Sequence, residues 1–285
     1  MEKTQPQIIT NSTKSPRPKK SLGQHFLTDR HIRNRIMTAA DLTENTQVVE
    51  IGAGKGFLTK ELVRRSGNVV VVELDNTLAQ RLAGQLGQHP SLKIITGDAR
   101  TVSIGSLAQA DRPYKLVANL PYYAATPIIR RFLEAEHKPA TMIVMVQREV
   151  AKTMTALPGK MSLLSIAIQI YGKPRIICNV PARAFKPPPS VVSSVVKIDI
   201  YSKLVIPGGT TQEFFNIVRA GFSAPRKQLI NSLSIGLSIP QSHTKTILGT
   251  ADIEPSRRAQ TLTIDEWIRV AEKYHHNPQR GIRVQ

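Results

Sequence analysis

The stretch Val48-Val49-Glu50-Ile51-Gly52-Ala53-Gly54-Lys55-Gly56 decides the fold. Its first four residues predict a short buried strand. The three glycines predict a tight turn, because glycine accepts backbone conformations closed to other residues and lets a ligand lie against bare main chain. Residues 57–65 then have the spacing of an amphipathic helix. A strand, a glycine turn and a helix in this order are typical of the start of an α/β sheet.

Strands and helices alternate on both sides of this stretch. A helix is expected over 29–40, where Ile32, Ile36, Met37 and Ala40 share one face. Further strands are expected over 69–72, 93–95, 115–118, 142–146 and 193–200, and further helices over 77–86, 127–136 and 163–171. This alternation predicts an α/β fold of Rossmann-like type, a parallel sheet with helices on both faces.

The pattern changes near Pro207-Gly208-Gly209, after which only helical periodicity is found, over 214–222, 226–233 and 264–274. Residues 1–20 are rich in Ser, Thr, Pro and Lys and have little to bury. We therefore expect a flexible basic arm over 1–20, an α/β domain over 21–206 and a small all-α domain over 207–285.

The charge of the chain narrows the class of partner. The 285 residues include 39 Lys and Arg against 20 Asp and Glu, a net charge of +19 that is spread along the chain. Such a field attracts polyanions, so a nucleic acid is the expected partner. A single cysteine, Cys178, argues against a disulfide scaffold, and we expect no metal site. No apolar run is long enough for a membrane span and no secretory signal is evident, so we expect a cytoplasmic protein without membrane contact.

Three acidic residues follow successive strands of the predicted sheet. Glu50 and Glu73 end the first two strands, and Asp98 follows the third, so all three should meet at the carboxyl edge where α/β ligands bind. A dinucleotide is disfavoured, because its fingerprint needs a third glycine where Phe57 stands and its pyrophosphate would be repelled. S-adenosylmethionine fits better. Glu73 can accept from the ribose hydroxyls and Asp98 from the adenine amine.

The fourth strand is followed by Asn119-Leu120-Pro121-Tyr122. This motif has the groups needed to activate an amine that is a poor nucleophile. The Asn119 oxygen and a backbone carbonyl from Leu120 or Pro121 could accept from the amine and aim its lone pair at a methyl group. Pro121 fixes the local backbone and offers no competing donor. Tyr122 provides a face on which a flipped base can stack.

These motifs occur in an order that resembles the bacterial small-subunit ribosomal RNA adenine dimethyltransferase family. The resemblance spans about residues 19–267 and includes Gln24-His25-Phe26-Leu27, the 50–54 block, Glu73, Asp98, the 119–122 motif, Val180-Pro181, Phe185, Pro187–Val191, Phe222-Ser223, Arg226-Lys227, Asn231 and 257–262. His25 stands where this family commonly has Asn.

The resemblance implies S-adenosylmethionine-dependent dimethylation, at N6, of two adjacent adenosines in the 3′-terminal hairpin loop of small-subunit ribosomal RNA. It implies a catalytic domain over 21–206 and an RNA-binding domain over 207–285, acting as a monomer on an assembling subunit. Within the site, it implies cofactor contacts from His25, Leu27, Glu50, Gly52, Gly54 and Asn119, and Phe185 as a second stacking face beside Tyr122. We expect Lys19, Lys20, Arg226 and Lys227 to contact RNA, because they flank matched motifs.

Three alternatives remain open at this point. A related large-subunit RNA methyltransferase that gives macrolide resistance is the nearest, although Leu120 and the C-terminal match favour the small subunit. A ribosome-assembly or transcription factor could keep the fold without the chemistry, but Asn119, Glu73 and Asp98 are all present. A dehydrogenase is the weakest, because the glycine spacing is wrong for it.

Overall fold

A computed structural model describes residues 18–19, 22–109, 111–204, 206 and 210–276. Its centre is a seven-stranded sheet of order β4-β3-β2-β5-β6-β9-β7. The seven strands are β2 (Gln47–Ile51), β3 (Asn68–Glu73), β4 (Leu92–Thr96), β5 (Tyr114–Asn119), β6 (Thr141–Gln147), β7 (Gly172–Val180) and β9 (Ser193–Ile200). A separate two-stranded sheet pairs β1 (Phe26–Leu27) with β8 (Phe185–Lys186).

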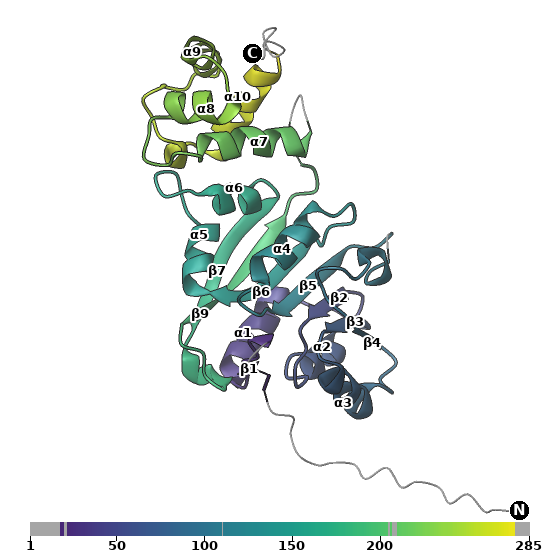
Figure 1. The fold of residues 1–285 in the computed structure, drawn as a ribbon. Helices are drawn as coiled ribbons and strands as arrows, with labels where there is room; N and C mark the ends of the chain where they lie inside the picture. The colour runs from purple at the N-terminus through teal and green to yellow at the C-terminus, as the bar shows by residue number, and fades with distance from the viewer. Residues whose placement is uncertain (1–17, 20–21, 110, 205, 207–209, 277–285) are drawn as a thin grey trace, which may run out of the picture.

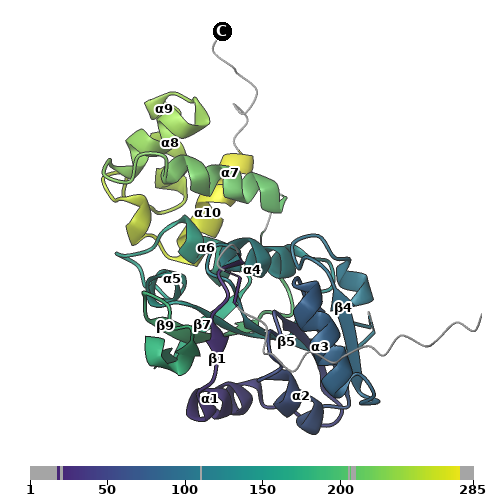
Figure 2. The same ribbon diagram turned by 60° about the horizontal axis from the view of Figure 1, so that its bottom comes forward.

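Helices cover both faces of the large sheet, as the alternation predicted (Figures 1 and 2). α1 (Arg30–Ala40) precedes β2, and the helices between strands of the large sheet are α2 (Thr59–Arg65), α3 (Asn76–Leu86), α4 (Ala125–Glu134), α5 (Arg148–Met154) and α6 (Leu163–Gln169). Alternate residues of one strand belong to different clusters: Val69 and Val71 of β3 pack with the cluster around α1 and α2, and Val70 and Val72 with the cluster around α4 and α6. Successive side chains of a strand point to opposite faces of the sheet, and both faces are covered here. Central strands are therefore apolar at every position.

The prediction of a parallel sheet is correct for five strands and wrong for two. β2 to β6 run parallel, whereas β9 is antiparallel to both β6 and β7. β7 was not predicted, because Lys173, Pro174 and Arg175 interrupt its apolar residues. Its position at the end of the strand order explains why a proline is tolerated there, since an edge strand has one side without ladder hydrogen bonds.

Four helices follow β9: α7 (Thr211–Gly221), α8 (Leu229–Leu237), α9 (Gln241–Thr250) and α10 (Ile264–His275). α8 begins three residues later than the helix predicted over 226–233, because residues 224–227 form a turn. α9 was not predicted, since its buried residues are only Thr244, Ile247 and Leu248. The predicted domain boundary at 206–207 falls beside residues 207–209, which lie outside the described residues. Most of the predicted arm over 1–20 lies outside them too.

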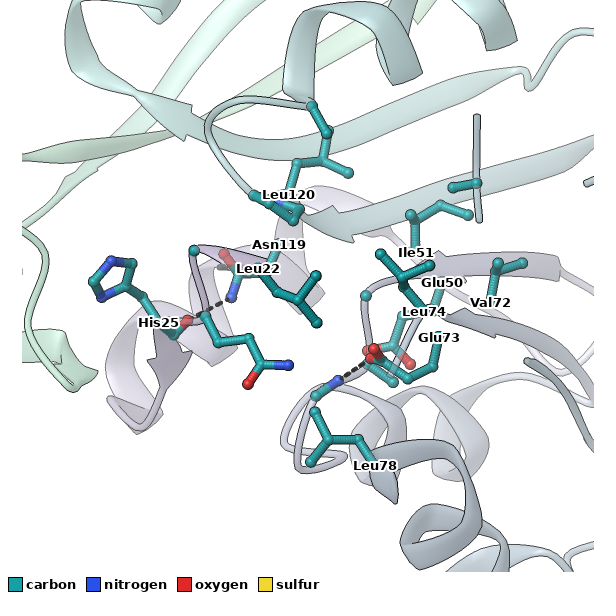
Figure 3. A pocket seen from close by; sticks show the side chains of 18 of the residues that line it. Leu22, His25, Glu50, Ile51, Val72, Glu73, Leu74, Leu78, Asn119 and Leu120 are labelled. Carbon is teal, nitrogen blue, oxygen red and sulfur yellow. Dashed lines mark hydrogen bonds between the residues drawn. The ribbon is translucent and has the colours of Figure 1, made fainter. Parts of the chain in front are cut away.

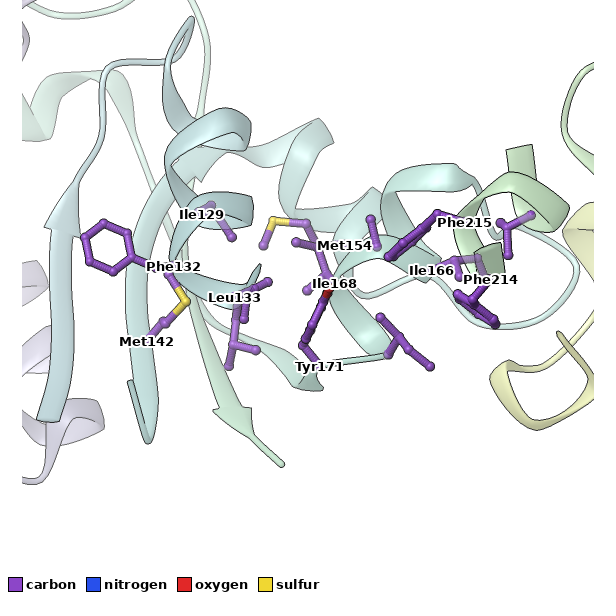
Figure 4. Packing of buried hydrophobic residues seen from close by; sticks show 14 of the residues in the cluster. Ile129, Phe132, Leu133, Met142, Met154, Ile166, Ile168, Tyr171, Phe214 and Phe215 are labelled. Carbon is purple, nitrogen blue, oxygen red and sulfur yellow. The ribbon is translucent and has the colours of Figure 1, made fainter. Parts of the chain in front are cut away.

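The C-terminal helices share a hydrophobic cluster with the α/β part of the molecule. Phe214 and Phe215 of α7 belong to the same cluster as Ile166 and Ile168 of α6, and that cluster continues to Phe132 of α4 (Figure 4). The helical part therefore packs on the sheet-covering helices through a continuous apolar seam.

We expect Gly236→Ala to destabilise the helical part by about 1–3 kcal/mol, because overpacking of a tight contact forces backbone shifts. A Cβ at Gly236 would lie 2.5 Å from the Ala220 Cα, where α8 crosses α7. Gly249→Ala in α9 is the matched control: a Cβ there meets nothing within 4 Å, so it should be neutral or stabilising by up to ~1 kcal/mol. Urea unfolding of both variants measures the difference, and an equal midpoint for the two would contradict this packing.

Candidate methyl-donor and base-binding site

A cavity opens at the carboxyl edge of the sheet, between the turns after β2 and β3, the loop after β5 and residues 22–27 (Figure 3). Its outline takes in roughly 1100 Å³ of space between protein atoms, part of which is open solvent. Glu50, Glu73 and Asp98 all line it, together with Asn119-Leu120-Pro121-Tyr122. The sequence motifs that were expected to meet are therefore in one place.

The glycine turn lies close to the Phe26 ring and to the loop after β5, at the edge of the cavity. Gly52, Gly54 and Gly56 all have positive φ angles, of 75°, 58° and 76°. A Cβ on Gly54 would lie 3.0 Å from the Phe26 ring, and one on Gly52 would lie 3.3 Å from the Asn119 carbonyl oxygen. Glycine is needed here both for the backbone conformation and for the close approach of the Asn119 loop.

Glu73 holds this edge of the cavity together. Its side chain accepts hydrogen bonds from the Gly54 N–H at 2.8 Å and from the Asp75 N–H at 2.9 Å, one on each oxygen. Burial raises its pKa, while these two N–H donors oppose the rise. Each oxygen keeps a second acceptor position, which suits a pair of hydroxyl donors.

Glu50 differs from the other two acids because its carboxyl group lies in the protein interior. The Thr59 hydroxyl donates to it at 2.6 Å, and the residue is 1% exposed. Burial raises the pKa of Glu50 to about 8, against the opposing effect of the Thr59 hydrogen bond. At neutral pH this group is therefore mainly protonated, unlike the anionic rim that the sequence suggested.

We expect the stability of the protein to fall with rising pH on account of Glu50. A carboxyl whose pKa is raised from 4.5 to about 8 by folding binds more protons in the native state across that window. The unfolding free energy then falls by up to about 1.4 kcal/mol per pH unit. Glu50→Gln removes this contribution, so its stability relative to wild type should increase between pH 5 and pH 8.

Urea unfolding at several pH values measures this difference, and the exposed Glu44→Gln variant controls for the loss of one carboxylate. A constant difference between Glu50→Gln and wild type over the window would contradict the buried, protonated state of Glu50.

Asp98 lies in a short loop that two arginines hold in place. Arg100 pairs with its carboxylate, with the shortest nitrogen–oxygen distance at 2.6 Å, and this hydrogen bonding lowers the pKa of Asp98. Arg131 of α4 donates to the carbonyl oxygens of Ala99 and Val102. The sequence patterns predict this role for neither arginine, and only the closeness of Arg100 to Asp98 in the chain hints at it.

The loop after β5 presents Asn119 and Tyr122 in fixed orientations. The Asn119 Nδ2 donates to the His25 carbonyl oxygen at 3.2 Å, which leaves the amide oxygen as the free acceptor (Figure 3). The Tyr122 hydroxyl lies 2.7 Å from that of Ser193, a fully buried residue at the start of β9. Leu120 is buried, and the Pro121 carbonyl accepts from the Ala124 N–H at 3.0 Å. Ser193 had no signal in the sequence.

Residues 22–27 form one wall of the cavity. Leu27 pairs with Phe185 in the β1–β8 sheet, and both are buried. Beyond this wall, the Lys19 Nζ lies 3.0 Å from the Asp75 carboxylate, which also accepts from the Gln24 side chain at 3.1 Å. Lys19, expected at an RNA surface, is thus held beside the cavity by an acid that the sequence analysis did not single out.

Two other predicted RNA contacts, Arg226 and Lys227, do not line the cavity. Arg226 and Lys227 are exposed in the turn between α7 and α8, and Lys20 lies outside the described residues. Across the described part of the chain, no group of three His, Cys, Asp or Glu residues is placed to hold a metal ion. Nor is any helix of that part long and apolar enough to cross a membrane.

Comparison with known proteins identifies the family of the chain. The family model described as "Ribosomal RNA adenine dimethylase" matches residues 16–274. A protein of Dehalococcoides mccartyi named "Ribosomal RNA small subunit methyltransferase A" is 44% identical over 262 residues, covering 92% of this chain and 90% of the relative. One of the same name from Alkaliphilus oremlandii is 38% identical and covers 87% and 88%.

Two solved structures share the fold over most of their length. A dimethyladenosine transferase from Plasmodium falciparum has a TM-score of 0.76 at 23% identity, covering 86% of this chain and 96% of that one. The 23S rRNA methyltransferase ErmE has a TM-score of 0.71 at 26% identity, covering 87% and 98%. The match of the family model to nearly the whole chain, together with curated relatives above 30% identity, shows that the chain belongs to the ribosomal RNA adenine dimethylase family.

Proposed function

We propose that this protein transfers methyl groups from S-adenosylmethionine to N6 of two adjacent adenosines in the 3′-terminal hairpin loop of small-subunit ribosomal RNA. The observation that carries the proposal is the meeting of the Asn119–Tyr122 loop with Glu73 and Asp98 in one cavity. The small subunit is favoured because the curated relatives bear that name at up to 44% identity. The substrate would be an assembling small subunit in the cytoplasm.

The cavity has the groups that S-adenosylmethionine requires. Glu73 would accept from the two ribose hydroxyls with the free positions on its oxygens, and Gly52 and Gly54 let the ligand approach the main chain. Leu74, Ala99 and Ile128 provide apolar wall for the adenine ring, whose amine would share Asp98 with Arg100. Glu50 would support the turn from inside through Thr59. When bound, the cofactor supplies an electrophilic methyl group.

The chain's own residues would then prepare the amine of adenosine. The Asn119 amide oxygen accepts one N–H, and the Leu120 carbonyl is the better second acceptor because that of Pro121 already binds the Ala124 N–H. With both N–H groups held, the nitrogen lone pair points at the methyl carbon. The cofactor would supply the methyl group, with the bonding electron pair staying on its sulfur, and the amine would then lose its N6 proton to solvent. Tyr122 stacks on the base, and Phe185 closes the pocket behind it.

The RNA itself would be held mainly by its phosphates, given the net charge of +19. We assign Lys20, Arg226 and Lys227 to this contact, with Lys19 beside the cofactor wall. The C-terminal helices, 207–285, would position RNA relative to the catalytic part, 21–206. One chain carries every group of the site, so we propose that it acts as a monomer.

Methylation of purified ribosomal subunits tests the function directly. Incubation with labelled S-adenosylmethionine and either unmethylated small or large subunits, followed by mapping of the modified base, should give two adjacent dimethylated adenosines in the small subunit. Label in the large subunit would favour the macrolide-resistance type of activity. Tight binding to a subunit without methyl transfer to either one would favour an assembly factor instead of an enzyme.

We expect Arg226→Ser and Lys227→Ser each to weaken RNA binding about equally for all sequences and to reduce the slope of log affinity against log salt by about 1. Both side chains are exposed, so the fold should be unaffected. Fluorescence anisotropy with a labelled hairpin between 50 and 200 mM salt measures the slope. A slope equal to that of wild type would remove the residue from the RNA surface.

A further inference from the structure

A second tyrosine follows Tyr122 directly and lies at the opening of the cavity. Tyr123 is one of the residues that line the cavity, yet 53% of it is exposed. It belongs to the turn before α4, which the Ala124 N–H closes by donating to the Pro121 carbonyl at 3.0 Å. A large aromatic side chain exposed beside a ligand cavity is accessible to a partner that approaches the cavity from outside.

The groups around Tyr123 suit a nucleotide. The cavity wall passes close to the ring, since a Cβ on Gly23 would lie 3.8 Å from two of the ring carbons. Arg100, whose side chain is 50% exposed, lies within electrostatic range of the Tyr123 hydroxyl. Asp98 fixes its guanidinium through Nε and Nη2, and Nη1 takes no part in those bonds. An exposed ring beside a fixed guanidinium offers a face to a base and donors to a phosphate.

Tyr122 can stack on one base only. One face of its ring is turned to the His25 ring, with the centroids 6.1 Å apart and the planes inclined by 23°, and its hydroxyl lies 2.7 Å from that of Ser193. The target adenosine takes the remaining face, and the next nucleotide in the strand has then lost its stacking partner, which costs free energy. Because consecutive Cα atoms are about 3.8 Å apart, Tyr123 lies beside the place where that nucleotide must pass.

We propose that Tyr123 binds the nucleotide next to the target adenosine, whose base stacks on the exposed face of the ring. This inference rests on the proposed function and adds a second base subsite outside the cavity. The ligand is an RNA base and not the cofactor, because the cofactor would fill the interior between Glu73 and Asn119, whereas more than half of Tyr123 faces solvent. For one of the two adjacent target adenosines, the nucleotide held by Tyr123 is the other one.

A double-mutant cycle between protein and RNA tests this contact. The probe is a labelled RNA hairpin with a single target adenosine, together with two derivatives in which the nucleotide on its 5′ or its 3′ side is abasic. Fluorescence anisotropy gives each dissociation constant. We expect Tyr123→Ala to weaken binding of the intact hairpin roughly five-fold or more, and one abasic derivative to weaken binding to wild type by a similar factor. The two changes together should weaken binding no further than either alone. Tyr123→Phe, which keeps the ring, should bind like wild type.

Tyr201→Ala is the matched control, because Tyr201 is 50% exposed but follows β9 at the edge of the sheet opposite the cavity. It should leave RNA binding unchanged. Calorimetry should show that Tyr123→Ala alters the S-adenosylmethionine Kd by less than about two-fold. The proposal is overturned if Tyr123→Ala and both abasic changes weaken binding independently, if Tyr123→Ala leaves RNA binding unchanged, or if it weakens only the cofactor. Failure of wild type to methylate either subunit would instead contradict the proposed function, and the binding cycle does not depend on that result.

Discussion

Asn119→Ala is expected to lose about two to three decades of methyl-transfer rate while it keeps its fold and its affinity for RNA. The Asn119 side chain makes one hydrogen bond across the cavity, to the His25 carbonyl, and its oxygen is the free acceptor. In the proposed mechanism that oxygen acts where the amine develops positive charge, so its loss should raise the barrier more than it weakens binding. By analogy with an oxyanion-hole donor, one preorganised polar contact is worth ~2.7–4 kcal/mol.

Single-turnover methylation at saturating enzyme measures this loss, with RNA binding and thermal unfolding recorded for the same variant. Tyr122→Ala is the informative comparison. It removes a stacking face worth ~1–3 kcal/mol per base, so it should weaken capture of the adenosine as well as turnover. An Asn119→Ala enzyme that methylates at the wild-type rate would place the chemistry elsewhere in the chain.

Glu73→Ala is expected to weaken S-adenosylmethionine binding by about two decades or more and RNA binding hardly at all. Two hydrogen bonds to a charged acceptor are lost, at ~1.5–3 kcal/mol each. The same substitution also releases the N–H groups of Gly54 and Asp75, so the cavity edge loses its internal support. Both effects reduce cofactor affinity.

Calorimetry with S-adenosylmethionine measures the first effect, and Glu73→Gln helps to separate the two. Glutamine keeps the shape of the side chain and one acceptor oxygen, so its affinity should fall between those of Glu73→Ala and wild type. An unchanged dissociation constant in Glu73→Ala would remove Glu73 from the cofactor site.

The fold could be predicted where burial alone determines the pattern. Val69–Val72 and Met142–Val146 are apolar throughout because both faces of these central strands are covered, and such runs are easy to recognise. β7 and α9 could not be recognised, because each is half-exposed and its sequence mixes charge, proline or β-branched residues with few apolar ones. The antiparallel addition of β9 depends on tertiary pairing that no local pattern encodes.

The residues that line the cavity could be predicted from the sequence, but the hydrogen bonds that their side chains make could not. Residues at strand ends were expected at one sheet edge, and Glu50, Glu73, Asp98 and Asn119 all line the cavity there. The buried Glu50 carboxyl finds its hydrogen-bond donor in Thr59 of the following helix, and Asn119 donates to a main-chain carbonyl 94 residues away. Such contacts appear only when the chain has folded.

The apolar seam between α6 and α7 fixes the distance between the C-terminal helices and the cavity. Phe214 and Phe215 are buried in the same hydrophobic cluster as Ile166 and Ile168, and the turn with Arg226 and Lys227 follows α7 directly. Side chains packed at the density of a crystal do not slide, so the separation between that turn and Tyr122 is set by the protein. Under the proposed function, an RNA whose backbone and target base are differently spaced would reach one of the two but not both. Selection of the substrate would then depend on the spacing between its backbone and its target base, with no need for either end of the protein to read a base sequence.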